Sequence, residues 1–294
     1  MKNKGLVFSF VVMILWGLLF PTVKLGYKIF EISSVSDILT FAGLRFLICG
    51  LIISIFVLVR NPKAYKALKK HWHMVLLAGV FSIILHYSFT YIGLSITEGS
   101  KTAILKQLGA VFYICFSAMF FPDDKLTIRK IVGLALGIFG IFVINADATG
   151  IKFHVGDLLI IGASFCTVFS NVISKKVFRH VEPIVATGVS QLFGGVVLLS
   201  AGLSCGGNVM SVTPTTKSEF GVFAVIIAAS VISYCLWFIV VQKEKLSKLF
   251  VIKFTEPLFA AAFGWFILGE NIWNIRYLLA FVFISVGIMV SNKE

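Results

Sequence analysis

The sequence predicts an all-α integral membrane protein with ten transmembrane helices, arranged as two inverted repeats of five helices. Three observations predict this class. Hydrophobic residues make up 59% of the chain and charged residues only 13%, with a mean hydropathy of +0.99; soluble domains average about 25% charged residues. Ten apolar stretches are long enough to cross a bilayer. The two halves of the chain also resemble each other.

Each predicted span is a run of roughly 20 mostly apolar residues. The first half holds the runs 6–26, 38–59, 73–94, 102–121 and 130–146. The second half holds the runs 156–177, 183–204, 220–242, 249–268 and 275–291. The first run lacks a small-residue cleavage site, so we expect it to remain as a membrane helix. The longest connection, 205–219, is rich in Gly, Pro, Ser and Thr, which predicts an irregular loop.

The distribution of basic residues predicts the orientation. With the N-terminus inside, most lysines and arginines fall on the inner side, where the loop RNPKAYKALKKHWH at 60–73 is the strongest marker. Basic residues favour the cytoplasmic side of membrane proteins. We therefore expect a protein of the cell membrane with both termini cytoplasmic. The few basic residues of the outer segments are Lys24, Lys28, Lys101, Lys152, Lys217 and Arg276.

Net charge and cysteine content exclude several classes of partner. The net charge is +13, but the basic residues sit mostly at span ends, so the expected partner is membrane lipid and no nucleic acid. The cysteines form no CxxC pair, so neither a disulfide framework nor a metal site is expected. No cofactor is expected either. The five cysteines are Cys49, Cys115, Cys166, Cys205 and Cys235.

The second half of the chain repeats the first at a shift of 147 residues. YSFTYIGL at 87–94 aligns with YCLWFIVV at 234–241, and GSKTAILKQ at 99–107 aligns with LSKLFVIKF at 246–254. Since five spans is an odd number, the second half would enter the membrane upside down. Inverted repeats are typical of secondary transporters. We expect repeat domains at 1–147 and 148–294 that expose a central site to either side in turn.

Short motifs spread along the chain carry a family resemblance. ILWG at 14–17 and GLRF at 43–46 lie in the first half; Gln191, Glu256-Pro257 and Gly269-Glu270 lie in the second. This ordered set resembles the EamA branch of the drug/metabolite transporter superfamily. The resemblance implies a ten-helix bundle that moves small metabolites, amino acids among them, often outward. Lys106 and Lys253 depart from the usual apolar residues of the family, so the substrates can differ.

Lys106 and Lys253 occupy matching positions of the two repeats, each about one turn into its helix. One interpretation is that each lysine extends to the membrane interface. The other is that both ammonium groups face the cavity and hold an anionic group such as a carboxylate. Glu256 follows Lys253 by three residues, which places both on one helix face. Glu256 is thus either half of a structural ion pair beside a kink at Pro257 or a substrate or proton site.

Polar and aromatic residues within other spans complete the candidate binding site. Arg45 is too deep to face lipid cheaply and is either a structural anchor or a substrate contact, and Gln191 occupies a similar place. A lone histidine such as His86 is more often a packing residue than a pH switch. Aromatic residues offer flat apolar surface with a polar handle, as core or as cavity wall. The remaining candidates are Trp16, Tyr87, Tyr91, Asn171, Tyr234 and Trp237.

The glycines Gly133, Gly137 and Gly140 form a stripe that suits close helix packing, within the bundle or in a homodimer. The hypothesis that best fits all of these patterns is a secondary transporter that exports small organic metabolites such as amino acids or related carboxylates. The alternative is a carrier of lipid-linked or phospholipid-like molecules. An enzyme is not expected, because the sequence contains neither an HExxH pair nor a GxSxG elbow.

Overall fold

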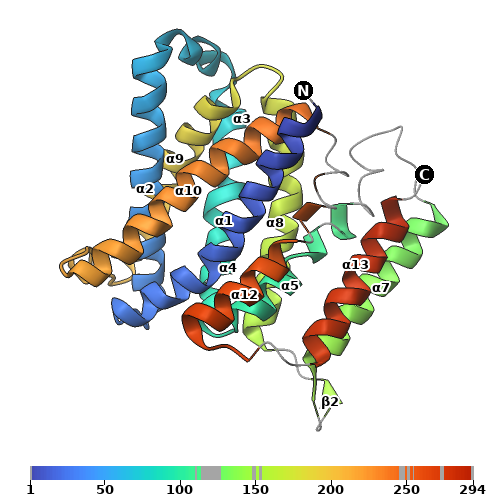
Figure 1. Cartoon of the computed structure of the whole chain (residues 1–294). Coiled ribbons are helices and arrows are strands. Elements are labelled where there is room, and N and C mark those ends of the chain that lie inside the picture. The colour runs from blue at the N-terminus through green and yellow to red at the C-terminus, as the bar shows by residue number, and fades with distance from the viewer. Residues whose placement is uncertain are drawn as a thin grey trace.

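The protein is a bundle of membrane-length helices (Figure 1). The computed structural model describes residues 2–109, 111–113, 127–147, 150–151, 154–244, 249, 252–253, 255–271 and 275–292. Six helical segments of this part are long and apolar enough to cross a membrane, and three shorter apolar helices lie at 131–140, 256–268 and 275–287. The expected spans 102–121 and 249–268 lie partly outside the described residues.

Within the described residues, the first half contains the following helical segments in the expected order. They are α1 (Lys2–Ile29), α2 (Val35–Arg60), the segment built from α3 (Leu68–Gly79), π-helix η2 (Val80–Leu85) and α4 (His86–Ser95), then α5 (Gly99–Leu105) and α7 (Ile128–Asn145). A 3₁₀-helix, η1 (Pro62–Ala67), joins α2 to α3. The basic loop of the sequence is therefore largely helical.

The second half follows a two-residue strand pair, β1 (Ala146–Asp147) with β2 (Gly150–Ile151). Its helices are α8 (Val155–Val177), α9 (Pro183–Ser204), α10 (Lys217–Lys243), α12 (Glu256–Leu268) and α13 (Ile275–Asn292). The long connection between α9 and α10 is irregular as predicted, apart from a short 3₁₀-helix, η3 (Met210–Val212).

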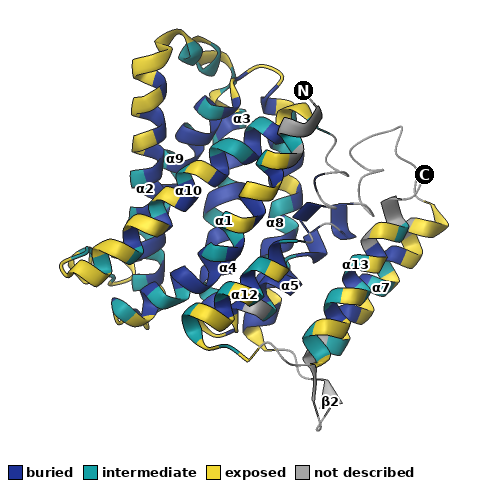
Figure 2. Ribbon diagram, viewed as in Figure 1, coloured by how far each residue is buried: buried dark blue, intermediate teal, exposed yellow. Residues whose placement is uncertain are grey.

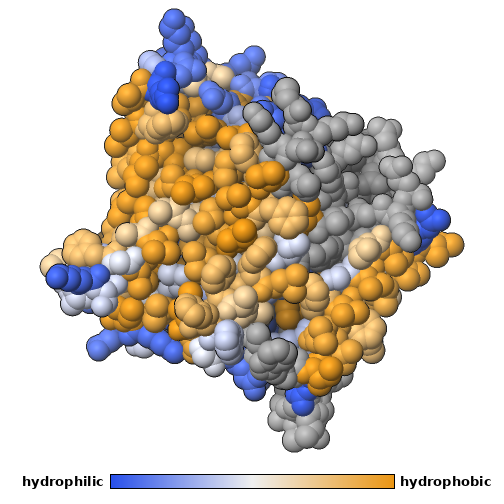
Figure 3. Space-filling view, viewed as in Figure 1, coloured by the Kyte–Doolittle hydropathy of each residue, from blue (hydrophilic) through white to orange (hydrophobic). Residues whose placement is uncertain are grey.

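The outer surface of the bundle suits a lipid environment. Large apolar side chains such as Ile55, Val59 and Phe266 are more than half exposed. Figure 2 shows these exposed positions along the outward faces of helices whose inward faces are buried. Figure 3 shows apolar residues across the flank of the molecule and hydrophilic residues gathered toward its two ends. The fold therefore presents an apolar flank between two polar ends, as a bilayer requires.

Glycines allow α2 and α9 to pack in contact along their lengths, antiparallel to each other. A Cβ atom at Gly43 would lie 2.3 Å from the backbone nitrogen of Leu199, and one at Gly195 would lie 2.3 Å from that of Leu47. Because lipid tails are as apolar as leucine, such close van der Waals packing is the main source of helix association in membranes.

The predicted glycine stripe packs within the chain. α7 lies beside α13 (Figure 1), where a Cβ at Gly140 would meet Ile284 at 2.7 Å and one at Gly287 would meet the Gly133 carbonyl at 2.7 Å. This stripe is thus covered by α13 of the same molecule, and a homodimer, which stays a prediction, would need another surface.

Two expectations about local structure were wrong. Pro257 does not kink a continuous helix, because α12 begins at Glu256 and Pro257 lies in its first turn, where a proline has no donor to lose. Lys106 lies at the C-terminal cap of α5, and Lys253 precedes the start of α12. Lys106 therefore lies at the end of a short helix instead of one turn inside a long one, whereas Lys253 is itself helical and lies before the turn at Thr255.

Candidate functional site

A cavity lined by apolar, aromatic and charged side chains lies in the middle of the bundle, enclosed by α1, α2, α4, α8 and α10 and by the residues around Lys106 and Lys253. The empty space between its walls totals about 700 Å³, including the part that opens to solvent. Its lining residues are Trp16, Leu19, Phe20, Val23, Arg45, Ser82, His86, Tyr87, Thr90, Tyr91, Leu94, Lys106, Thr167, Ser170, Asn171, Tyr234, Trp237, Phe238, Lys253 and Glu256.

Eleven of the twelve candidate residues from the sequence line this cavity, and Gln191 does not. Gln191 is fully buried in α9, and neither its amide oxygen nor its amide nitrogen has a hydrogen-bond partner among the described residues. Its neighbour Ser190 donates to the carbonyl of Val75 on α3. The polar residue that the sequence placed in the site therefore lies on a helix used for packing.

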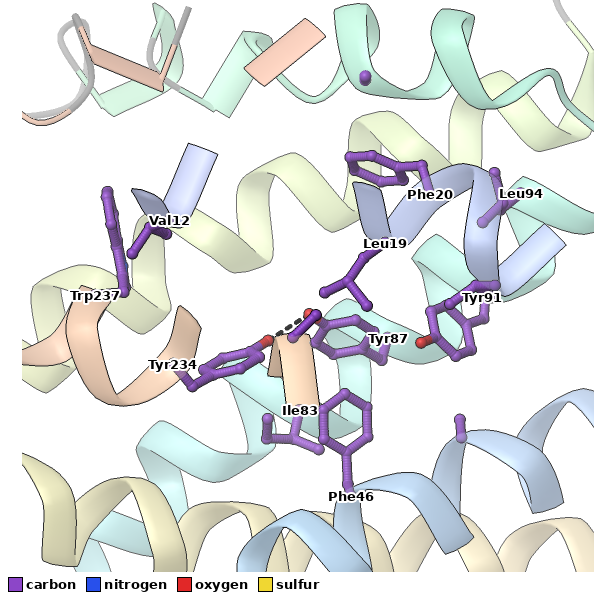
Figure 4. Close-up of a cluster of buried hydrophobic side chains, with 14 of the residues drawn as sticks. Val12, Leu19, Phe20, Phe46, Ile83, Tyr87, Tyr91, Leu94, Tyr234 and Trp237 are labelled. Atoms are coloured by element: carbon purple, nitrogen blue, oxygen red, sulfur yellow. Dashed lines mark hydrogen bonds between the residues drawn. The ribbon is translucent and has the colours of Figure 1, made fainter. Parts of the chain in front are cut away.

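Two tyrosines from matching positions of the repeat meet at the cavity. Figure 4 shows the hydroxyl groups of Tyr87 on α4 and Tyr234 on α10 pointing toward one another, joined by a hydrogen bond that Tyr234 donates. Both residues are buried, and Phe46 packs against Tyr87 with ring centroids 4.4 Å apart. A residue and its counterpart 147 positions later thus share one contact.

An aromatic wall surrounds the ammonium group of Lys253. The rings of Trp16 and Trp237 lie 4.9 Å apart, and the ammonium nitrogen lies 5.2 Å and 5.6 Å from their centroids. The indole N–H of Trp237 donates to Asn171 at 3.2 Å, which fixes that ring, whereas the indole N–H of Trp16 has no hydrogen-bond partner in the described ranges. Lys253 is only 6% exposed, so its side chain does not extend to the membrane interface.

His86 connects α8 to the second lysine. It is the first residue after the π-helical segment, a helix irregularity that frequently marks functional sites. Its Nδ1 lies 3.0 Å from the Ala163 carbonyl and 3.1 Å from the Thr167 hydroxyl, and its Nε2 lies 3.3 Å from the Lys106 ammonium. A carbonyl only accepts, so Nδ1 carries the proton and the Nε2 lone pair accepts from Lys106. The imidazole is therefore neutral in this arrangement.

Arg45 anchors α2 to α10 beneath the cavity. Its Nε and Nη2 donate to the Ser230 hydroxyl at 3.0 Å and 2.7 Å, and its guanidinium carbon lies 4.7 Å from the Phe46 ring centroid. Tyr87 and Tyr91 each place a ring centroid 5.5 Å away. Aromatic ring faces stabilise a cation. The arginine is 1% exposed, which favours the anchoring role over direct contact with a substrate.

Glu256 supplies a carboxylate to the cavity. It is 2% exposed at the first position of α12, where the partial positive charge of a helix N-terminus stabilises an anion. The carboxylate interacts electrostatically with both Lys106 and Lys253. Its Oε2 atom has no hydrogen-bond partner within the described part of the chain, so it is an acceptor beside the donors of the cavity wall.

The repeat identifies cavity residues that the motif search missed. Phe20 and Thr167, Val23 and Ser170, Thr90 and Trp237, and Tyr91 and Phe238 all line the cavity and are related by the shift of 147 residues. So are the tyrosine pair and the lysine pair. Adding 147 to each first-half candidate would have located Phe238, and subtracting it from Trp237 would have located Thr90.

A polar layer links the ends of several helices outside the cavity lining. Glu270 accepts from the Gly99 amide at 2.9 Å, at the start of α5, and lies 3.7 Å from the ammonium of Lys24 on α1. Lys101 pairs with the buried Asp157 of α8 at 2.8 Å. Gly269 adopts a left-handed conformation, φ 67°, which ends α12 and turns Glu270 back toward α5. Ion pairs thus connect α1, α5, α8 and the end of α12.

The part of the chain that the structure describes contains no group of three or more His, Cys, Asp or Glu residues placed to hold a metal ion. Cys49, Cys166, Cys205 and Cys235 are free thiols, and Cys115 lies outside the described residues.

Sequence and structure comparisons identify the family. The sequence model of the EamA-like transporter family matches the chain twice, at residues 3–146 and 154–293. An uncharacterized transporter of Bacillus subtilis, YoaV, is 24% identical over 96% of this chain and 94% of its own length. A probable amino-acid metabolite efflux pump of Escherichia coli is 24% identical over 99% and 95%.

A solved crystal structure shares the fold, with a TM-score of 0.70, 17% identity, and coverage of 99% of this chain and 96% of that one. The two family matches together span nearly the whole sequence and include every residue that lines the cavity. The chain belongs to the EamA-like transporter family of the drug/metabolite transporter superfamily.

Proposed function

We infer that this transporter moves small organic metabolites, such as amino acids or related carboxylates, through the central cavity by alternating access. The observation that carries the inference is the origin of the cavity wall. Six pairs of residues related by the repeat line one space, so both halves build the same site. A site at the junction of two similar units is the arrangement used by secondary transporters built from inverted repeats.

The helix contacts support a two-fold relation between the halves. α2 packs against α9, and α7 packs against α13, so in each pair a helix contacts its own counterpart. α1 packs against α10, and α8 packs against α4, which is the same contact made in the other half. Two units related in this way can exchange conformations, so that the cavity would open to one side of the membrane while it closes to the other.

The polar layer around Glu270 would then act as the gate on the outer side, since the basic residues favour a cytoplasmic location of both termini. Residues Lys24, Lys101 and Glu270 fall in the predicted outer segments. Breaking these ion pairs would free α5, whose C-terminal cap is Lys106, and the end of α12, which follows Lys253 in the chain. Export is the direction we infer, in line with the efflux pump named among the relatives.

Reconstituted vesicles test this function. Purified protein in sealed proteoliposomes should exchange labelled amino acids or organic acids across the membrane, whereas Thr167→Trp, which fills the cavity, should abolish exchange. Ser95→Trp, at an exposed position of α4, is the matched control and should retain it. Equal exchange by the parent and Thr167→Trp would contradict the proposal. Movement of fluorescent phospholipid without exchange of small solutes would instead favour the lipid-carrier alternative.

A further inference from the structure

The described residues that line the cavity carry unequal numbers of positive and negative charges. Arg45, Lys106 and Lys253 are cations, and Glu256 is the single carboxylate among them. His86 does not alter the balance, because it accepts a hydrogen bond from Lys106 in its neutral form. A charge inside a membrane protein is costly unless an opposite charge or water compensates it. The lining therefore holds an excess of positive charge.

The arginine accounts for only part of this excess. Its Nε and Nη2 donate to the Ser230 hydroxyl and its guanidinium lies over aromatic rings, so we assign it to the framework of the site. Both lysines also line the cavity: the Lys106 ammonium lies 4.9 Å from the Phe20 ring centroid, and the Lys253 ammonium lies over the two tryptophans. One Glu256 carboxylate lies within electrostatic range of both and cannot neutralise two ammonium groups.

The unpartnered polar atoms of the wall indicate what the ligand offers. Among the described residues, neither the buried indole N–H of Trp16, beside Lys253, nor the buried hydroxyl of Tyr91 has a hydrogen-bond partner. A carboxylate accepts from both an ammonium group and an indole N–H. The paired rings of Trp16 and Trp237 provide a flat apolar surface for the remainder of a small molecule.

We propose that the cavity selects small organic anions, that is, carboxylates of net negative charge, over neutral compounds of the same size and shape. Lys106 and Lys253 provide the charge that selects them, and the two tryptophans hold the apolar part. This inference rests on the proposed function, since it names the substrate class of the same cavity. The inference is narrower than the proposed function. Transport of neutral or zwitterionic metabolites would agree with the proposed function but contradict selection for anions.

Matched acid and amide pairs test the selection by binding alone. The probes are succinate and succinamide, glutamate and glutamine, benzoate and benzamide, and indole-3-acetate and indole-3-acetamide, titrated into the purified full-length protein by isothermal titration calorimetry. We expect at least one acid to bind about tenfold or more tightly than its own amide, the size expected for a charge-assisted contact. Absence of an acid preference in every pair, including absence of binding, would overturn the proposal.

Variants that remove single charges identify the residues that produce the preference for acids over amides. Lys106→Gln and Lys253→Gln should each reduce the acid preference about tenfold, whereas Lys253→Arg should retain part of it. Glu256→Gln should increase it, because the competing carboxylate is removed. Lys217→Gln, at an exposed position at the start of α10, is the control and should leave the preference unchanged. Thermal unfolding of each variant in detergent shows that it is folded. A preference that both lysine variants retain would overturn the assignment to this cavity.

Vesicle transport separates this proposal from the function on which it depends. If the parent protein exchanges an amide as fast as the matching acid, and Thr167→Trp blocks both, the cavity is the transport path but it does not select for charge. If the acid alone is exchanged and the lysine variants lose that exchange, both proposals are supported. If nothing in the panel is exchanged while acids bind selectively, the binding proposal holds and the proposed function fails.

Discussion

At the scale of single residues, the cavity is organised by polar contacts that link one half of the chain to the other. Arg45 bonds to Ser230, His86 bonds to Ala163, and Tyr87 bonds to Tyr234. Each contact joins residues far apart in sequence. Buried polar groups are costly when unpaired, so these contacts specify how the halves fit together.

The tyrosine pair offers a direct test of that role. Tyr87→Phe or Tyr234→Phe leaves one buried hydroxyl without its partner, so each single change should lower the free energy of unfolding by about 1–2 kcal/mol. The double change removes both hydroxyls and should cost less than the sum of the single changes. Denaturant unfolding in detergent measures all three. Strict additivity would contradict the contact.

The sequence predicted the identities of these residues better than their partners. The tyrosines, tryptophans and lysines of the cavity were recognisable because polar and aromatic side chains are unusual at matching depths of two apolar repeats. The bond from His86 to Ala163 was not predictable, because its acceptor is a backbone carbonyl that every residue has. Gln191 was misplaced because the sequence does not reveal which face of α9 packs against other helices.

At the scale of secondary-structure elements, glycine positions determine how closely α2 approaches α9. Gly195→Ala places a methyl group 2.3 Å from the backbone nitrogen of Leu47, so the helices must separate. We expect a loss of about 1–3 kcal/mol in the free energy of unfolding, the usual cost of overpacking. Unfolding in detergent by denaturant provides the measurement.

Gly221→Ala is the matched control for this change. Gly221 lies in α10, and a Cβ atom there meets no atom within 4 Å. The alanine should leave stability unchanged or raise it by up to about 1 kcal/mol, since glycine is the poorer helix former. Equal effects of the two substitutions would show that α2 and α9 are not in such close contact.

The polar layer gives a second prediction for an element. Glu270→Ala removes both the acceptor for the Gly99 amide and the partner of Lys24, so the start of α5 should open more often. Faster hydrogen exchange of the 98–105 segment, measured by mass spectrometry, is the expected result, with Glu270→Gln intermediate. Glu219→Ala, which removes a cap at the start of α10, should leave this segment unchanged. If hydrogen exchange of the 98–105 segment is unaltered in Glu270→Ala, the proposed gate role of the polar layer is contradicted.

Several element boundaries were not predictable because hydropathy does not detect breaks in apolar helices. The run at 249–268 is mostly apolar, yet α12 begins only at Glu256, and the run at 73–94 contains a π-helical segment. The charge and the proline of Glu256-Pro257 did signal a departure from a regular helix. The structure shows that this departure is the start of a helix and not a kink within one.

At the scale of the whole molecule, the repeat accounts for both the packing and the site. Counterpart helices contact each other, and counterpart residues line one cavity. This organisation was visible in the sequence because aligned charges and tyrosines recur at a constant shift. The shape and charge of the cavity could not be predicted, since they depend on which faces of α1, α4, α8 and α10 turn inward.

Accessibility of the cavity from both sides of the membrane tests the central claim of alternating access most directly. Thr167→Cys lines the cavity, and Ser95→Cys is exposed at the end of α4. Each would be introduced into a background in which five native cysteines are replaced: Cys49, Cys115, Cys166, Cys205 and Cys235. A membrane-impermeant thiol reagent is then applied to sealed vesicles from one side or the other.

We predict that Thr167→Cys is labelled from either side and that Ser95→Cys is labelled from one side only. Blocking the cavity with Phe20→Trp, at the repeat counterpart of Thr167, should reduce labelling of Thr167→Cys from both sides. Labelling of Thr167→Cys from a single side, or from neither side, in vesicles that are active in exchange would contradict the account.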